Sequence, residues 1–330
     1  MKTAYIVQTG ATLRREGNLL EVHVQRKREA QIPVYELKQL VIAGNVLITP
    51  GALDLLLERG VDTVLLTQRG KYRARIVGRG STHVALRLAQ YEALRDPDRV
   101  VTVSKAIVAG KIANQRTFLM HHARDRENAS DLRRASLSMR ATLERLGEAK
   151  TPDEVRGCEG AAAAAYFRAF GHLIEVPAFA FQVRSRRPPM DPTNALLSLG
   201  YTFLFNVVES AVHVVGLDPY LGALHATESG RASLVCDLQE EFRTPVVDAL
   251  VVAAIAHGAM QPGDFEDAGE GQPVVMKQEA VRTFATLFER RLARPRETLS
   301  LAHGRRAASA SNGAALLGGR SLRTFRDEVR

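Results

Sequence analysis

The apolar residues of this chain change their spacing near Val84, and this change most constrains the fold. Before it, short runs rich in valine, isoleucine and leucine are separated by turn residues, a pattern typical of β-strands. After it, apolar residues recur with the period of an amphipathic helix, as from Leu86 to Leu94. The sequence therefore predicts an α+β fold, with a small N-terminal β-sheet domain followed by an all-helical C-terminal domain.

Short segments with the strand pattern are spread over the N-terminal part. They are Tyr5–Gln8, Leu19–Val24, Gln31–Tyr35, Val61–Thr67 and Tyr72–Val77. Thr49 followed by Pro50 is a typical helix start, and Gly60 would end that short helix. We therefore expect a sheet with antiparallel or mixed pairing, interrupted by one helix.

The remaining chain is predicted to be helical up to a basic tail. One helix runs through Ile107 and Leu119, a second covers residues 129–146, and a third begins after Thr151 and Pro152. A later helix contains Asp237 and Glu240 and is expected to stop at Thr244-Pro245, where the next one begins. The expected division is residues 1–83 (β-rich), 84–302 (helical) and 303–330 (a flexible basic tail).

The segment from Ala195 to Val215 is apolar enough to raise the question of a membrane span. It carries Asn206, Glu209 and His213, which are costly in hydrocarbon, so we interpret it as a buried core helix. The N-terminus lacks the pattern of a signal peptide. Two cysteines in a chain of this size do not make a disulfide framework. A cytoplasmic protein without a membrane segment is therefore expected.

The net charge of +9 attracts polyanions such as nucleic acid, although many basic proteins bind none. Several basic residues are candidates for contacts with a DNA backbone, and a solvated basic face is an equally good interpretation of them. They are Arg184, Arg186, Arg187, Lys111 and Arg116. Only 6% of the residues are aromatic and none is tryptophan, which makes an RNA-associated protein a weaker alternative.

A small set of acids and one histidine are candidates for a metal site. Glu159 lies in the apolar context CEGAAAAAYF, where its helix neighbours offer no cation to pair with. His225 ends the run GLDPYLGALH, and taken alone it is more often an ordinary core or surface residue. Asp237 and Glu240 share one helix face, which is otherwise typical of a solvated acidic surface.

Two carboxylates and an imidazole together suit a divalent cation such as Mg²⁺ or Mn²⁺. Zinc is less favoured because no cysteine is expected among the ligands. In a basic protein, such a site brings a phosphate close to carboxylates through the metal. The combination therefore favours phosphodiester chemistry.

Several long motifs, in order, resemble the CRISPR-associated spacer-acquisition integrase family over nearly the whole chain. They are AGKIANQR (109–116), CEGAAAAAYF (158–167), SRRPPMDPTNALLSLGY (185–201), GLDPYLGALH (216–225) and SLVCDLQEEFR (233–243).

The resemblance implies that Glu159, His225 and Glu240 bind Mg²⁺ or Mn²⁺, with Asp237 close by as a supporting or DNA-handling acid. It also implies a homodimer formed through the β-rich domain, a small ferredoxin-like protein partner and double-stranded DNA as the substrate. The expected activity is insertion of captured DNA fragments into a repeat array by attack of a 3′-hydroxyl, with associated endonuclease and disintegration activity. A metal-dependent nuclease of branched DNA and a non-catalytic DNA-binding scaffold stay open as alternatives.

Overall fold

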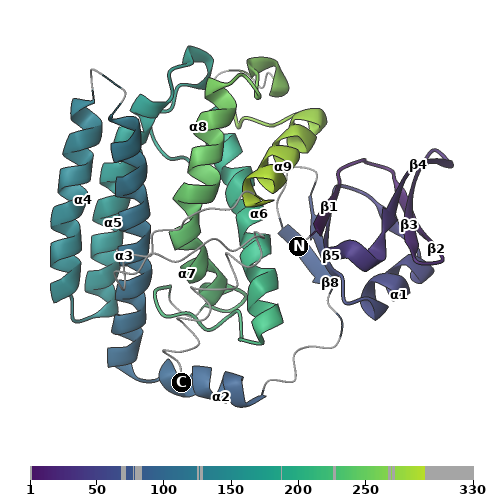
Figure 1. Cartoon of the computed structure of the whole chain (residues 1–330), viewed down its shortest axis with the longest axis horizontal. Helices are drawn as coiled ribbons and strands as arrows, with labels where there is room; N and C mark the ends of the chain where they lie inside the picture. Colours follow the sequence, from purple (N-terminus) through teal and green to yellow (C-terminus); the bar gives the residue numbers. More distant parts are fainter. Residues whose placement is uncertain are drawn as a thin grey trace.

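The computed structural model describes residues 2–67, 72–76, 78, 84–124, 126, 129–186, 188–225, 228–266, 269 and 272–293. Strands occupy the N-terminal part of the chain and helices the rest, as the change of apolar spacing predicts (Figure 1). The expected tail, residues 303–330, lies outside the described residues.

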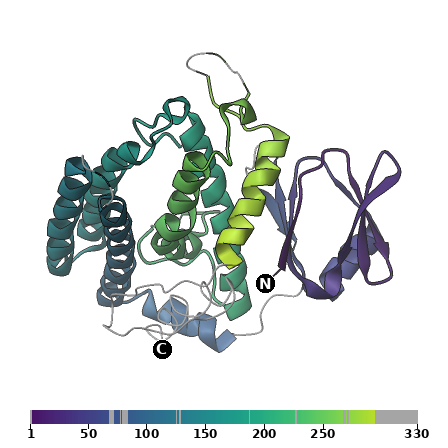
Figure 2. The same ribbon diagram turned by 45° about the horizontal axis from the view of Figure 1, so that its top comes forward.

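The strands form two mixed four-stranded sheets that face each other (Figure 2). One sheet has the order β1 (Lys2–Ile6), β5 (Leu37–Ala43), β7 (Asp62–Leu66), β8 (Tyr72–Ile76). The other has the order β4 (Lys27–Pro33), β3 (Leu19–Val24), β2 (Thr12–Glu16), β6 (Leu47–Ile48). Each sheet combines parallel and antiparallel pairs, so the predicted mixed pairing is confirmed.

Strands β2, β5 and β6 were not predicted, and for β5 its position in the sheet explains why. It pairs in parallel with both β1 and β7, and all but one of its residues are buried. A strand buried on both faces has no alternation of polar and apolar residues for the sequence to reveal.

The predicted short helix is present as α1 (Pro50–Glu58), with the hydroxyl of Thr49 accepting from the amide of Ala52.

The described helices after residue 83 include the expected ones and one α-helix, Gln278–Ala293, that was not predicted. They are α2 (Val84–Ala93), α3 (Pro97–His122), α4 (Ser130–Glu148), α5 (Pro152–Phe170), α6 (Pro192–Val215), α7 (Ser233–Phe242), α8 (Ala249–Ala256) and α9 (Gln278–Ala293). Helices α3, α4 and α5 pack against one another, and α3 also packs against α7 (Figure 1). The apolar side of the β1–β8 sheet joins the helical core through Val41 and Val64.

The predicted stop at Thr244-Pro245 is wrong, because the chain continues from α7 through a π-helical segment, Arg243–Asp248, directly into α8. A proline crowds the preceding turn of an α-helix and lacks one amide hydrogen. The wider π turn accommodates both effects.

Helix α6 is long and apolar enough to cross a membrane, but most of it is buried inside the protein. Its polar residues Asn206 and Glu209 are buried as well. They meet Arg75 of β8, whose guanidinium pairs with Glu209, lies 2.6 Å from Oδ1 of Asp62 and donates to the backbone oxygen of Asn206. The side chain of Glu209 and the backbone of Asn206 therefore tie this core helix to the β-rich domain.

Candidate active site

Three helices bring one lysine and two glutamates together in the helical region. Nζ of Lys111, on α3, lies 2.6 Å from Oε2 of Glu240 on α7 and pairs with Oε1 of Glu159 on α5. The side chains of Lys111 and Glu240 are almost fully buried, whereas that of Glu159 is 26% exposed. The two carboxylates therefore converge on one cationic atom from different helices.

Close packing between α3 and α7 makes this meeting possible. Gly110, next to Lys111, lies against Glu241, where an added Cβ would meet the glutamate side chain at 3.2 Å. Nδ2 of Asn114, one turn further along α3, donates to the backbone oxygen of Glu241 at 2.8 Å. The small residue and the amide together hold α7 against α3.

Asp237 organises the end of the loop that carries His225. One oxygen of its buried carboxylate, Oδ2, accepts from the backbone amides of Ala223 at 2.6 Å and Leu224 at 3.0 Å. The other, Oδ1, accepts from the amide of His225 at 3.0 Å and lies 2.6 Å from its Nδ1. A carboxylate can only accept here, so Nδ1 carries the hydrogen and the lone pair of the ring lies on Nε2. This is the tautomer that binds a metal through Nε2.

The loop from Gly216 to His225 is fixed from its other side by α2. The amide of the buried Gln90 donates to the backbone oxygens of Asp218 and Leu221 and accepts from the amide of Asp218. Gly222 has no room for a side chain, because an added Cβ would lie 2.6 Å from Oδ2 of Asp237. The position of His225 is therefore set by contacts along the whole loop.

The electrostatics of the site keep Glu240 ionised. Burial would raise the pKa of Glu240, but the charges of Arg243 and Lys111 and the hydrogen bond from Lys111 outweigh burial and lower that pKa. A buried carboxylate that stays anionic suits a metal ligand.

Of the predicted ligands, Glu159 and Glu240 meet at a common atom, whereas His225 pairs with Asp237, three residues before Glu240 on α7. Among the residues described, no three His, Cys, Asp or Glu side chains stand close enough together to hold a metal ion. Lys111 takes the space between the carboxylates, where a divalent cation would be attracted by the same two negative charges. The donor set of two carboxylates and one oriented imidazole fits Mg²⁺ or Mn²⁺ once Lys111 moves aside.

Several residues differ from their predicted setting. Glu159 does have a cation to pair with, because Lys111 reaches it from another helix. Lys111 itself is buried in the site and not on a solvated basic face. Asp237 is fully buried, which fits support of His225 and leaves it no surface for DNA.

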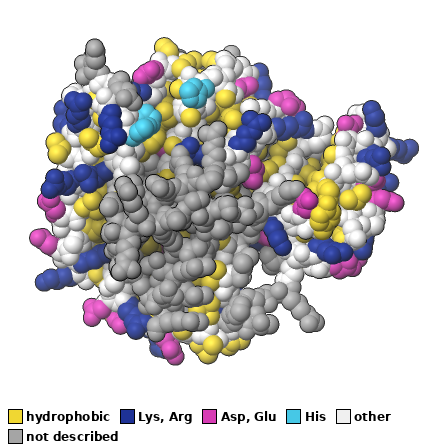
Figure 3. Space-filling view, viewed as in Figure 1, with side chains coloured by type: hydrophobic (Ala, Val, Ile, Leu, Met, Phe, Trp, Pro, Cys, Tyr) yellow, Lys and Arg dark blue, Asp and Glu magenta, His cyan; other side chains and the backbone are white. Residues whose placement is uncertain are grey.

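The predicted backbone-binding arginines are dispersed. Arg184 donates to Oδ1 of Asn194 and to the hydroxyl of Ser198, and Nε of Arg116 donates to the backbone oxygen of Ser136. Arg186 is exposed, and Arg187 lies outside the described residues. The basic side chains visible in Figure 3 are likewise distributed over both domains.

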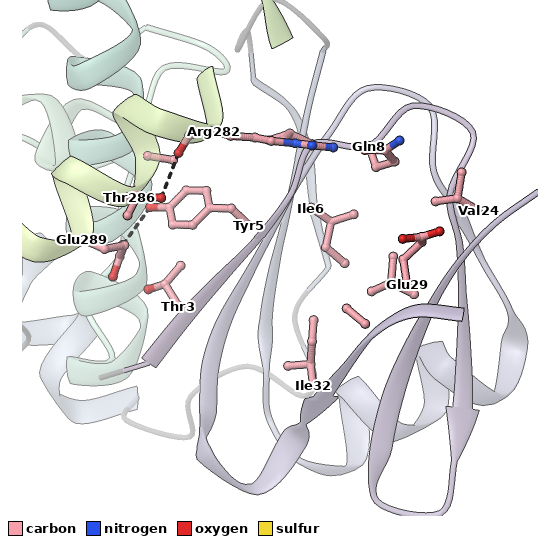
Figure 4. Close-up of a pocket in the computed structure, with 14 residues that line it drawn as sticks. Thr3, Tyr5, Ile6, Gln8, Val24, Glu29, Ile32, Arg282, Thr286 and Glu289 are labelled. Carbon is pink, nitrogen blue, oxygen red and sulfur yellow. Dashed lines mark hydrogen bonds between the residues drawn. The ribbon is translucent and has the colours of Figure 1, made fainter. Parts of the chain in front are cut away.

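A cleft of about 790 Å³ lies apart from this site, between the open edge of the β-rich domain and α9 (Figure 4). There the hydroxyl of Tyr5, on β1, donates to Oε1 of Glu289 at 2.8 Å. Burial and the neighbouring Glu289 raise the pKa of Tyr5. None of the predicted site residues that the structure describes lines this cleft.

Comparison with known proteins identifies the family. The family model described as "CRISPR associated protein Cas1" matches residues 4–290. "CRISPR-associated endonuclease Cas1 2" from Rhodospirillum rubrum is 36% identical over 302 residues, which cover 88% of this chain and 86% of that protein.

Solved structures share the fold. A CAS1 protein from Thermotoga maritima has a TM-score of 0.82 at 24% identity, covering 99% of this chain and 97% of that one. A casposase bound to integration product has a TM-score of 0.83 at 23% identity, covering 100% of this chain and 90% of that one. A chain of a Cas6-RT-Cas1–Cas2 complex has a TM-score of 0.82 at 21% identity, covering 99% of this chain and 35% of that one. This chain therefore belongs to the Cas1 family of CRISPR-associated proteins.

Proposed function

We propose that this protein is a metal-dependent DNA integrase of CRISPR adaptation, which inserts captured DNA fragments into a repeat array. The observation that carries the proposal is the convergence of Glu159 and Glu240 on one cationic atom, together with an imidazole that is oriented by Asp237, three residues before Glu240 on α7. Membership of the Cas1 family and the shared fold of a casposase bound to integration product support it.

In this proposal Glu159, Glu240 and Nε2 of His225 hold Mg²⁺ or Mn²⁺. The bound cation would offset the charge that develops on the scissile phosphate and orient the attacking hydroxyl. Asp237 keeps the His225 ring in one tautomer and one orientation. Asp237 is therefore a positioning residue.

The reaction exchanges one phosphodiester for another. The 3′-hydroxyl oxygen of the captured fragment loses its proton and forms a bond to phosphorus. The bond from phosphorus to the 3′-oxygen of the repeat strand breaks, and that oxygen takes up a proton. One such bond replaces another, so the reaction needs no ATP and can run in reverse.

A nuclease acting on branched DNA is the second candidate. The relative from Rhodospirillum rubrum bears the name of an endonuclease, which favours it. Water in place of the 3′-hydroxyl would give cleavage with the same residues. A non-catalytic DNA-binding scaffold would not need a metal at all.

We further propose a homodimer formed through the β-rich domain and a second, small ferredoxin-like protein partner. Tyr35 and Leu47 of the β-rich domain are more than 60% exposed, so their apolar side chains are accessible to a protein contact there. A chain of the same fold occurs in a solved Cas6-RT-Cas1–Cas2 complex, which contains both Cas1 and Cas2.

We also propose the cytoplasm as the location of this protein. Its two free cysteines, Cys158 and Cys236, are compatible with that reducing compartment.

The test is joining of a labelled DNA duplex to a supercoiled plasmid that carries a repeat, with Mg²⁺, Mn²⁺ or chelator. We expect joining only with metal, and its loss in Glu159→Gln. Glu144→Gln is the matched control, because that glutamate is 70% exposed on α4. Cleavage of branched DNA without any joining would favour the nuclease. Joining at the wild-type rate by Glu159→Gln, or in chelator, would overturn the proposed site.

A further inference from the structure

Both carboxylate oxygens of Glu240 contact cationic side chains. One is Lys111, and the other is Arg243, which connects Glu240 to residues outside the site. Lys111 contacts Oε2, while Nη1 of Arg243 lies 2.7 Å from Oε1. Glu240 is almost completely buried. Its orientation is therefore determined by two side chains, of which only Lys111 lies between the proposed ligands.

Arg243 in turn lies over the ring of Tyr201 on α6. Its guanidinium carbon is 4.9 Å from the ring centroid, within the range of a cation–π contact. Arg184 lies over the same ring at 5.4 Å. Two guanidinium groups repel each other, so this arrangement needs a compensating negative charge nearby.

Glu240 supplies part of that charge to Arg243, and Asp248, at the end of the π-helical segment, supplies a second negative charge that acts on both guanidinium groups. Asp248 is 1% exposed, and its oxygens accept from three hydroxyls: Tyr201 at 2.6 Å, Tyr166 at 2.7 Å and Thr244 at 2.9 Å. A buried carboxylate costs free energy unless its oxygens are bonded, and these three donors satisfy it. Asp248 thereby fixes the Tyr201 ring on which Arg243 rests.

The same carboxylate also reaches the helix that carries the other glutamate. Tyr166 lies seven residues after Glu159 on α5, and residues seven apart share one face of a helix. Thr244 and Asp248 belong to the π-helical segment that continues α7, the helix of Glu240. Asp248 therefore connects α5, α6 and α7 behind the site. The three hydroxyls that it accepts from belong to residues that are not proposed metal ligands.

We propose that Asp248 is a positioning residue for the proposed metal site, acting on Glu240 through Tyr201 and Arg243. This inference rests on the proposed function. Three buried hydroxyl groups bind Asp248, and the Tyr201 ring supports Arg243. Together these contacts keep the Glu240 carboxylate in its binding orientation. Asp248 touches neither the DNA nor the metal in this arrangement.

The test is the dissociation constant of Mn²⁺ in the absence of DNA, measured on the full chain by electron paramagnetic resonance. The variants are Asp248→Asn, Tyr201→Phe and the double variant. Tyr201→Phe keeps the ring under Arg243 and removes only the hydroxyl, so it disturbs folding least. Asp54→Asn, at an exposed position on α1 of the β-rich domain, is the control.

We expect each single variant to weaken Mn²⁺ binding about tenfold, which is typical of lost support behind a metal ligand. The double variant should bind about as weakly as the weaker single one, because both substitutions break the same connection. A merely structural role would lower the unfolding temperature without changing the dissociation constant measured well below it.

Wild-type Mn²⁺ affinity in Tyr201→Phe, or additive losses in the double variant, would overturn the inference. Glu159→Gln separates this failure from failure of the proposed function. If Glu159→Gln loses Mn²⁺ while Tyr201→Phe keeps it, only the role of Asp248 is wrong. If the wild-type protein and Glu159→Gln bind Mn²⁺ equally, the proposed site itself is wrong.

Discussion

Oδ1 of Asp237 lies 2.6 Å from Nδ1 of His225, and the same buried carboxylate accepts three backbone amides of the loop that ends at this histidine. One side chain thus fixes both the path of the loop and the tautomer of the ring. This arrangement leaves Nε2 as the histidine atom available to a metal.

Asp237→Asn should therefore impair catalysis more than folding. The amide nitrogen of asparagine donates, so it cannot satisfy the donors that now surround both carboxylate oxygens. We expect strand transfer to fall about 10- to 100-fold and stability to fall by about 1–3 kcal/mol. Integration assays and urea denaturation measure the two effects. Asp153→Asn, at an 87% exposed side chain, should behave like the wild type in both.

Gly222→Ala tests the same loop without removing a polar group. The new Cβ would lie 2.6 Å from Oδ2 of Asp237 and 2.7 Å from the backbone carbon of Ser233, so the loop must move. A displacement on this scale at a catalytic group costs on the order of a hundredfold in rate. Gly147→Ala is the control, because no atom lies within 4 Å of its Cβ. Equal joining rates for the two variants would show that the loop position does not matter.

Lys111→Met should increase the stabilisation of the fold by a bound divalent cation. It removes the ammonium from between two carboxylates, and loss of one partner of a buried ion pair costs about 3–5 kcal/mol. A divalent cation should replace that charge, so Mg²⁺ should raise the unfolding temperature more in Lys111→Met than in the wild type. Scanning calorimetry with and without Mg²⁺ measures this difference. An equal rise in both proteins would contradict the account of Lys111 as the group in the cation's place.

Arg75→Met should destabilise the contact between α6 and the β-rich domain in a pH-dependent manner. Burial raises the pKa of Glu209 and Arg75 opposes this, so the pKa of Glu209 should rise further without the arginine. A carboxyl group with a raised folded-state pKa stabilises the fold while protonated, and this stabilisation is lost as the pH rises through that pKa. The variant should therefore lose more stability at pH 8 than at pH 5. Urea denaturation at both values tests the sign, and an equal loss would contradict it.

The sequence predicted the elements of the helical region well, because helix period and capping residues are local signals. Thr151 and Asp191 both cap their helices through side-chain oxygens. The strand β5 and the π-helical continuation after Phe242 were missed for a common reason. Each depends on neighbours from elsewhere in the fold, which local patterns do not contain.

The motifs predict the candidate ligands, which stay a prediction, but not the contacts that the structure shows around them. Motif order selected Glu159, His225 and Glu240, which no spacing rule alone would have selected. The pairing of Lys111 with both glutamates depends on how α3, α5 and α7 pack, and so does the support from Asp248 through Tyr201. A signal for Arg243 was present, since it follows Glu240 by three residues on the helix, where such pairs meet.

The most direct test of the central claim is a crystal structure of the protein soaked with Mn²⁺, with anomalous scattering locating the ion. We expect one anomalous peak within bonding distance of Glu159, Glu240 and Nε2 of His225. The ammonium group of Lys111 should be displaced from between the two carboxylates. A peak elsewhere, or none at these three side chains while Lys111 keeps its place, would contradict the claim.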